Sequence, residues 1–325
     1  MNPSVSVVVT TYNQAPYIEQ TVESVLAQTY APHEVIVVDD GSIDDTPSRM
    51  EQFDGRITYI RQKNQGVAGS RNTGIRKARG ELIAFLDGDD LWESEKLAVQ
   101  VSLAQAYPRS GLIVVDGVEF NDNEIVRSSL LSADFWKEFP GHEVESGNHY
   151  HRLLQRQFIS TSSQVMVPAK VFEIVGLSNG KFSRANDWDL YIRIAARFDV
   201  TVCKDRLTRW RCLESSASGP KTKRYFSYLP EEFAILQHHL RRAQGEERAF
   251  LRRTIRERVA EGLEELYYFG LKTDKAYARR LLLRLSFMHS SSRTAFIFLA
   301  GLCCPRWIAR KMGRAARTMT TVSHE

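Results

Sequence analysis

The sequence predicts an α/β fold with a mostly parallel sheet, because strand-like and helical segments alternate from the first residues onward. A β-branched run at Val5–Val9 precedes a segment, Tyr17–Gln28, whose apolar residues recur at helical spacing, and a second β-branched run follows at Glu34–Val38. A strand, a helix and a strand in this order favour parallel pairing. Acidic residues directly follow two of the predicted strands, at the edge where open α/β sheets bind ligands.

Further elements are predicted between residues 57 and 197, with a pattern that becomes less regular along the chain. A polar, aromatic stretch from Asn121 to His151 has no clear period. Strands are predicted at Ile57–Ile60, Leu82–Leu86, Leu112–Val115 and Gln164–Val167, and helices at Val67–Ala78, Ser94–Ala106 and Asp187–Arg197.

The chain is expected to contain one main α/β domain and a helical extension. Its 325 residues suffice for both. A Ser-, Gly-, Pro- and Lys-rich segment at 215–222 is interpreted as the linker, which gives domains at 1–220 and 221–325. The net charge of +5 is unevenly distributed: residues 221–325 hold 21 Lys and Arg against 10 Asp and Glu, whereas residues 1–220 are net acidic. The two parts are therefore expected to meet different partners.

Several classes of protein are disfavoured by what the sequence lacks. No phosphate-binding loop or dinucleotide-binding glycine motif is present. The four cysteines have no C-x-x-C spacing, which argues against a zinc site and a disulfide framework and favours a reducing compartment. The first residues do not resemble a signal peptide, and the longest apolar run, Ala295–Cys304, is about half the ~20 residues that a membrane-spanning helix needs. A cytoplasmic protein without a membrane span is expected.

The acidic clusters at the two strand ends admit two interpretations. Asp39-Asp40 and Asp87-Gly88-Asp89 could be turns or helix caps, since Asp and Gly favour both. Alternatively, because each cluster ends a separate strand of one sheet, both could face a common crevice. Carboxylate oxygens at that place suit a divalent cation.

Seven motifs in order along the chain carry a family resemblance. They are Ser6–Asn13, Ser24–Thr29, Val37–Ser42, Asn64-x-Gly66, Ser70–Gly74, Gly80-Glu81 and Phe85–Asp90. Together with Asn186–Leu190, they resemble the family 2 glycosyltransferases of GT-A fold, over approximately residues 4–215. The resemblance implies an inverting transferase that uses a nucleoside-diphosphate sugar and Mn²⁺ or Mg²⁺.

The resemblance also implies roles for residues on the donor side. Thr10, Tyr12 and Asp40 would hold the nucleobase, with Asp39 close by. Asp87 would face the ribose or the metal ion.

On the reacting side, the resemblance implies that Asp89 binds the metal directly and that Asp187 is the general base. The alternative for Asp187 is a helix cap. Two positions depart from the family pattern: Asn186 stands where the family often has Glu, and Arg211 is not followed by the usual His. Arg211 could still donate charge-assisted hydrogen bonds to the diphosphate. These departures motivate an alternative function, a catalytically silent protein that binds sugar nucleotides or acts as a scaffold.

The basic C-terminal region suggests a surface for a partner. Within residues 295–317 an apolar segment precedes arginines at every third or fourth position, as in a helix that lies on an anionic membrane. Its alternative is a helix packed on the catalytic domain with a charged outer face, and nucleic acid is the weakest of the three interpretations. The acceptor is then expected to be a glycan, or a lipid-linked glycan on the inner face of the cytoplasmic membrane.

Overall fold

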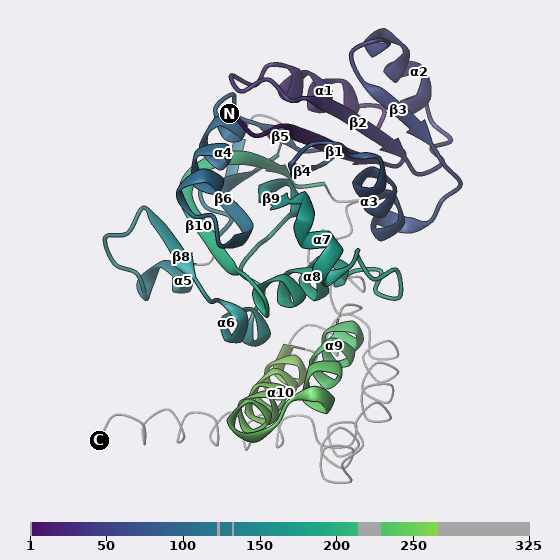
Figure 1. The fold of residues 1–325 in the computed structure, drawn as a ribbon. Helices are drawn as coiled ribbons and strands as arrows, with labels where there is room; N and C mark the ends of the chain where they lie inside the picture. The colour runs from purple at the N-terminus through teal and green to yellow at the C-terminus, as the bar shows by residue number, and fades with distance from the viewer. Residues whose placement is uncertain (1, 122–123, 132, 214–228, 266–325) are drawn as a thin grey trace. The chain divides into compact units, whose positions relative to one another are not determined.

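The computed structural model describes residues 2–121, 124–131, 133–213 and 229–265 (Figure 1). The chain divides into two compact units, residues 1–213 and 214–325. The expected linker at 215–222 and the membrane-binding segment expected at 295–317 lie outside the described residues.

The first half of the sheet is parallel, as the strand–helix–strand pattern predicts. It consists of β3 (Thr58–Arg61), β2 (Glu34–Asp39), β1 (Val5–Thr11) and β4 (Leu82–Asp87), in that order across the sheet. Every residue of β1 is buried, which is expected of a central strand that is covered on both faces.

The second half of the sheet is mixed. The order continues from β4 through β9, β6 and β10 to β5, and β9 is antiparallel to both of its neighbours, whereas β6 and β10 are parallel. The strands are β5 (Leu91–Trp92), β6 (Ser110–Asn121), β7 (Glu124–Arg127), β8 (Val144–Gly147), β9 (Val165–Pro168) and β10 (Asp199–Arg211). The sheet as a whole is the mixed, mostly parallel α/β sheet that the sequence predicts, although β10, the longest strand, is not among the predicted elements.

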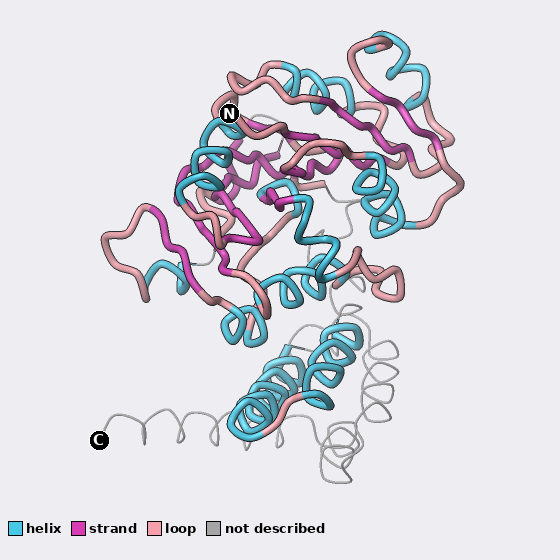
Figure 2. Tube along the Cα trace, viewed as in Figure 1, coloured by secondary structure: helices cyan, strands magenta, loops and turns pink. Residues whose placement is uncertain are grey.

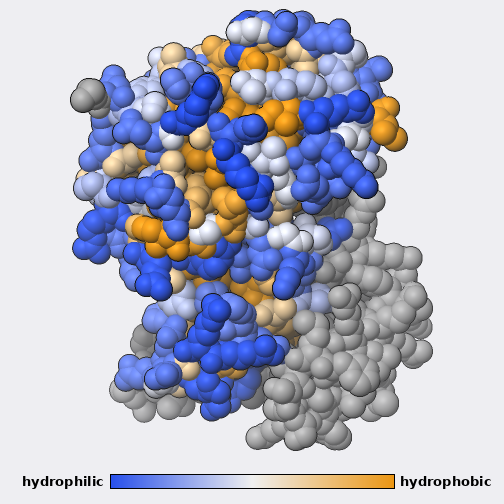
Figure 3. Space-filling model, turned by 45° about the vertical axis from the view of Figure 1, so that its right-hand side comes forward, coloured by the Kyte–Doolittle hydropathy of each residue, from blue (hydrophilic) through white to orange (hydrophobic). Residues whose placement is uncertain are grey.

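Helices accompany the strands of the first unit (Figure 2). Figure 3 shows that hydrophilic residues cover most of the coloured surface and that apolar residues form patches among them. The helices are α1 (Ile18–Leu26), α2 (Thr46–Met50), α3 (Gly66–Lys77), α4 (Lys96–Ala106), α5 (Ala133–Lys137), α6 (Tyr150–Gln155), α7 (Ala169–Val175) and α8 (Asn186–Ala195), with 3₁₀ turns at Glu51–Phe53 and Ser162–Gln164. α8 begins one residue before the predicted helix, and the predicted 112–115 strand is the middle of the longer β6.

The described part of the second unit is a pair of helices, α9 (Leu229–Arg242) and α10 (Gly245–Glu265). They pack against each other, and Arg258 of α10 donates a hydrogen bond to Glu232 of α9. Within the ranges that the structure describes, no helix combines the length and apolar character needed to cross a bilayer.

Candidate active site

The two acidic clusters lie at the same edge of the sheet, on either side of β1. In the strand register Thr11 of β1 is paired with Asp39 at the end of β2, and Thr10 is paired with Asp87 at the end of β4 (Figure 1). Parallel strands that end together bring their following loops together, so this edge can hold one ligand between the two clusters.

Asp39 and Asp40 are buried and hold the loops around them. Asp39 accepts hydrogen bonds from the Ser42 amide at 2.8 Å and the Tyr59 hydroxyl at 2.5 Å. Asp40 accepts the amides of Gln65 and Gly66, at 2.9 and 2.8 Å, where α3 begins. A carboxylate at this end of a helix is favoured by the helix dipole. Both residues therefore make the contacts expected of a turn and of a helix cap. Their contact with a nucleobase stays a prediction.

Thr10 and Tyr12 occupy the end of β1 in different environments. Thr10 is buried and donates its hydroxyl to Asp87 at 3.2 Å, whereas Tyr12 is 47% exposed. Between the two acidic clusters Asn13 has a positive φ of 52° and accepts the Ile43 amide at 2.9 Å. An exposed aromatic ring next to a fixed loop is available for stacking on a base.

Asp87 receives three side-chain hydrogen bonds from three parts of the fold. Its Oδ1 accepts from Arg71 at 2.9 Å and from Thr10 at 3.2 Å, and its Oδ2 accepts from Thr161 at 3.4 Å. The side chain is nevertheless 29% exposed. Asp87 is thus fixed in position with part of its carboxylate open to a ligand.

Asp89 and Asp90 complete the acidic loop, residues 87–90. Burial, followed by the negative charge of Asp87, raises the pKa of Asp89 to about 6. Burial and the charges of Asp89 and Asp87 also raise the pKa of Asp90, which is fully buried. Carboxylates that repel one another in this way are suited to a divalent cation, which would relieve the repulsion.

The acidic loop supplies part of a metal coordination shell. In the described ranges no group of three or more His, Cys, Asp and Glu side chains is arranged to hold a metal ion. Mg²⁺ in nucleotide sites is commonly bound through one or two carboxylates, with water and substrate phosphates as the other ligands. Asp87 and Asp89 fit that donor set.

Arg211 at the end of β10 holds the acidic loop. Its Nε donates to the Asp89 carbonyl at 2.9 Å, and its guanidinium lies 4.7 Å from the ring centre of Tyr17 and 4.5 Å from that of Phe120. Arg211 is only 7% exposed. Arg211 therefore anchors the acidic loop, and its contact with a diphosphate stays a prediction.

Asp187 lies in the first turn of α8 and is partly exposed. Its Oδ1 accepts the amide of Trp188 at 2.7 Å, and its Oδ2 accepts Gln157 Nε2 at 3.3 Å. Burial raises the pKa of Asp187, an effect that the positive charge of Arg71 opposes. The cap position of α8 is occupied by Ala185, so Asp187 is not the N-cap residue that the alternative interpretation requires.

Arg71, on α3, connects the acidic loop with the start of α8. It is 8% exposed. One of its terminal nitrogens donates a hydrogen bond to Asp87 at 2.9 Å, and the other donates one to the Asn186 side chain at 3.2 Å. The sequence analysis does not assign a role to Arg71, although it falls within the Ser70–Gly74 motif. The place of Arg71 inside that motif is the signal in the sequence that could have drawn attention to it, whereas its burial and its partners are visible only in the fold.

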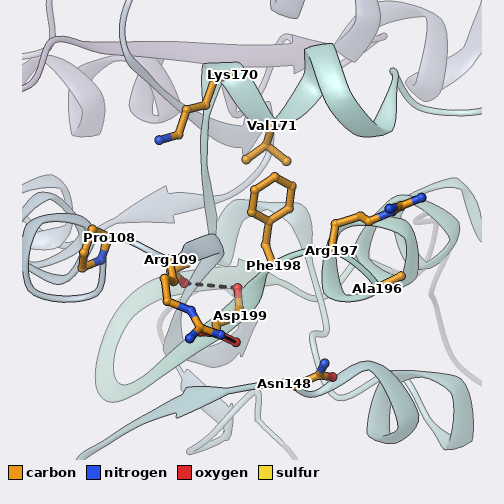
Figure 4. Close-up of a pocket in the computed structure, with 10 residues that line it drawn as sticks. Pro108, Arg109, Asn148, Lys170, Val171, Ala196, Arg197, Phe198 and Asp199 are labelled. Carbon is orange, nitrogen blue, oxygen red and sulfur yellow. Dashed lines mark hydrogen bonds and ion pairs between the residues drawn. The ribbon is translucent and has the colours of Figure 1, made fainter.

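A hollow of about 290 Å³ lies at the opposite edge of the sheet, where β6 and β10 begin (Figure 4). Phe198 and Val171 line it, and an ion pair of 3.1 Å joins Arg109 to Asp199 at its border. None of the predicted site residues lines this hollow. The candidate active site is therefore the acidic edge between β1, β4 and α8.

Known proteins match this chain most clearly over its first unit. The family model "Glycosyl transferase family 2" matches residues 6–160. An uncharacterized glycosyltransferase of Nostoc sp. is 35% identical over 149 residues, which are 44% of this chain and 46% of that protein. An uncharacterized glycosyltransferase of Rickettsia typhi is 27% identical over 192 residues, 59% of this chain and 58% of that protein. The matches thus span about half the length of these curated relatives.

Solved structures resemble the chain along almost its whole length. S. aureus TarS 1-349 in complex with UDP-GlcNAc has a TM-score of 0.67 at 17% identity, over 97% of this chain and 92% of that one. The mannosyltransferase PcManGT from Pyrobaculum calidifontis, in complex with GDP-Man and Mn²⁺, has a TM-score of 0.59 at 20% identity, over 100% and 89%. At these identities the likeness establishes the GT-A fold. Within this fold, the stretch that the family model matches, residues 6–160, is identified as a family 2 glycosyltransferase domain.

Proposed function

We propose that this chain is an inverting glycosyltransferase, which moves a sugar from a nucleoside-diphosphate sugar to a hydroxyl of a glycan or lipid-linked glycan. The observation that carries the proposal is the position of Arg71. By bonding to both Asp87 and Asn186, it joins the acidic loop to the start of α8, where Asp187 lies. A candidate donor site and a candidate base thus belong to one connected site.

On the donor side, Asp87 and Asp89 would hold Mn²⁺ or Mg²⁺. The bound ion would supply positive charge to the departing diphosphate. Arg211 holds this loop in place by a hydrogen bond from its Nε to the Asp89 carbonyl. A loop held in place before the donor arrives loses less entropy on binding.

On the acceptor side, Asp187 would take the proton of the attacking hydroxyl. The acceptor oxygen then forms its bond to the anomeric carbon as the bond from that carbon to the diphosphate oxygen breaks on the opposite face. One base and one displacement invert the anomeric centre without a covalent sugar–enzyme intermediate. Burial of Asp187 supports this role, because the raised pKa makes its carboxylate a stronger base.

The comparisons support the donor class. TarS has been solved with UDP and UDP-GlcNAc, and PcManGT with GDP-Man and Mn²⁺. By analogy with those proteins, we propose that this chain binds a nucleoside-diphosphate sugar as donor together with a divalent cation. A peripheral position on the inner face of the cytoplasmic membrane belongs to the same proposal, since a lipid-linked acceptor would be presented there. Residues 295–317 would make that contact.

The alternative proposal, a catalytically silent binding protein, is motivated by the two departures from the family pattern, and the structure bears on the first of them. Asn186 gives Arg71 a neutral partner where a Glu is usual in the family. Hydrolysis or transfer of any sugar nucleotide by the purified protein would exclude it.

Thermal unfolding with UDP-, GDP-, dTDP- and CDP-sugars, each with and without Mn²⁺, tests the proposed donor site. A ligand at 100 times its Kd stabilises a protein by about 2.7 kcal/mol, which for a domain of this size is a rise in Tm of roughly 5–10 °C. We expect that rise with one nucleotide class and only with Mn²⁺. A Tm that no nucleotide changes would contradict the proposal.

Replacement of Arg71 by Met tests its link to Asp187. Because the raised pKa of Asp187 places its ionisation above the ordinary Asp range, kcat should fall as the pH falls through that pKa. Without the opposing charge of Arg71, the pKa of Asp187 rises further, so the acid limb of the pH–rate profile should move to higher pH. Arg76→Met, an exposed change on the same helix, should leave the limb in place. An unmoved limb in Arg71→Met would refute the link.

A further inference from the structure

A buried turn at residues 160–164, which we name the hydroxyl turn, lies beside the acidic loop. Its sequence is Ser-Thr-Ser-Ser-Gln, and Thr161, Ser163 and Gln164 are 5%, 0% and 0% exposed. Buried hydroxyl and amide groups are costly unless they are paired, so each of them has to find a partner inside the fold.

The hydroxyls of this turn reach two carboxylates of the acidic loop. Ser163 Oγ donates to Asp90 at 2.5 Å and accepts the Asp87 amide at 3.0 Å. Thr161 Oγ1 lies 3.2 Å from the Asp90 carboxylate and 3.4 Å from that of Asp87, and its single proton can serve one of them at a time. The turn thus fixes both the backbone and the side chain of Asp87.

Gln164 closes the turn and attaches it to the sheet. Its Oε1 accepts the amides of Ser160 and Thr161, at 2.9 and 3.2 Å, in a capping-box arrangement. Its Nε2 donates to the carbonyl of Val115, in β6, at 3.0 Å. The backbone carbonyl of Gln164 accepts Gln100 Nε2 at 3.0 Å. The orientation of the turn is therefore determined by β6 and α4.

Lys96 of α4 supports Gln100 at the end of this chain of contacts. Its Nζ donates to Gln100 Oε1 at 2.6 Å and lies 3.8 Å from the ring centre of Trp92, whose Nε1 donates to the Ser163 carbonyl at 2.9 Å. Lys96 is 0% exposed, and burial, with no carboxylate of the described residues opposing it, lowers the pKa of its amine. A buried amine without a counter-charge costs stability, so folding alone does not explain a lysine here.

We propose that the hydroxyl turn is a positioning element, which orients Asp87 and Asp90 for donor and metal binding, and that Gln100 and Lys96 hold it in place. The inference rests on the proposed function, because it concerns the same donor site. In many metal sites, mutation of a residue that hydrogen-bonds to a metal ligand lowers the metal affinity 10–100-fold. Effects of about this size are therefore expected here.

A pair of changes at Thr161 separates positioning from packing. Thr161→Val keeps the shape and removes the hydroxyl, whereas Thr161→Ser keeps the hydroxyl and removes a methyl group. Mn²⁺ binding is measured from the electron paramagnetic resonance signal of the free ion, in the presence of UDP, GDP, dTDP or CDP. We expect Thr161→Val to weaken Mn²⁺ binding by about tenfold and Thr161→Ser by less than about threefold. Equal losses, or a larger loss in Thr161→Ser, would overturn the proposal.

Lys96→Met provides a second, independent test, with urea unfolding as the control for folding. A methionine fills the space beside Trp92 without an amine, so the urea midpoint should stay or rise, while Mn²⁺ affinity falls several-fold as Gln100 loses its partner. Ser110→Ala, which removes a buried hydroxyl at the opposite edge of the sheet, should change neither metal nor nucleotide binding. A lowered urea midpoint with unchanged Mn²⁺ affinity would make Lys96 a folding residue and refute its positioning role.

The unaltered protein separates this inference from the proposed function. If the wild type binds Mn²⁺ with none of the four nucleotides, the proposed donor site fails and the inference fails with it. If the wild type binds and the variants bind equally well, the inference alone fails.

Discussion

Asp187→Asn is expected to abolish sugar transfer while nucleotide and metal binding remain. The side chain keeps its size and can still accept the Trp188 amide, but it can no longer take a proton from an acceptor hydroxyl. General bases contribute about 10²–10⁴-fold to rate, and kcat should fall by that factor. Single-turnover transfer and donor affinity, measured on the same preparation, separate chemistry from binding.

The matched control is Asp189→Asn, two residues along the same helix. Asp189 is also an acidic residue of the first turn of α8, but it is paired with Arg193 at 2.9 Å. Both substitutions remove one negative charge from the same helix end, so any loss that arises from the helix dipole is common to the two. We expect Asp189→Asn to lower the Tm and leave kcat within about twofold, because Asp189 contacts no group of the candidate site. If Asp187→Asn retained transfer at the level of this control, Asp187 would not be the base.

The parallel half of the fold could be predicted from the sequence because its signals are local. β1 and β2 are continuous β-branched runs, and α1 has apolar residues at helical spacing between them. In β10 this signal is short: a β-branched run at 200–202 is followed by exposed residues such as Asp205 and Arg206, where the register shifts. Its 13 residues are extended because they pair with β6, which lies almost 90 residues earlier in the chain. The antiparallel direction of β9 is likewise set by distant neighbours.

The candidate site could likewise be predicted only in part. The motifs identify Asp87, Asp89 and Asp187 by their positions, because the residue types and the strand ends are visible in the sequence. What the sequence does not show is which partner each side chain meets. Arg211 is an example: the sequence suggests a diphosphate contact, which stays a prediction, but does not show that the guanidinium contacts two aromatic rings and that Nε donates to the Asp89 carbonyl. The role of Arg71 is hidden for the same reason, since its partner Asn186 is 115 residues away.

Asp89→Ala is expected to remove metal-dependent transfer. With Asp87 as the only remaining carboxylate ligand, the site should bind Mn²⁺ much more weakly. A bound metal supplies several kcal/mol of charge stabilisation in the transition state, and its loss corresponds to roughly 10²–10³-fold in kcat/KM. Asp54→Ala, at an exposed position after α2, is the control and should match the wild type. The measurement is the initial rate as a function of Mn²⁺ concentration, with EDTA-treated protein as the zero point.

The free energy of unfolding of metal-free Asp89→Ala is a second measurement. It should stay the same or rise, whereas activity falls. In the metal-free protein Asp89 is repelled by Asp87 and is poorly solvated, which is why its pKa is raised to about 6. Removing such a carboxylate relieves the repulsion, so the metal-free variant should be as stable as the wild type at pH 7, or more stable. A residue retained at a cost in stability is typical of ligand binding. If Asp89→Ala kept its rate in EDTA, Asp89 would not be a metal ligand, and neutralisation of the diphosphate would pass to an arginine beside this loop, such as Arg211, which donates to the Asp89 carbonyl.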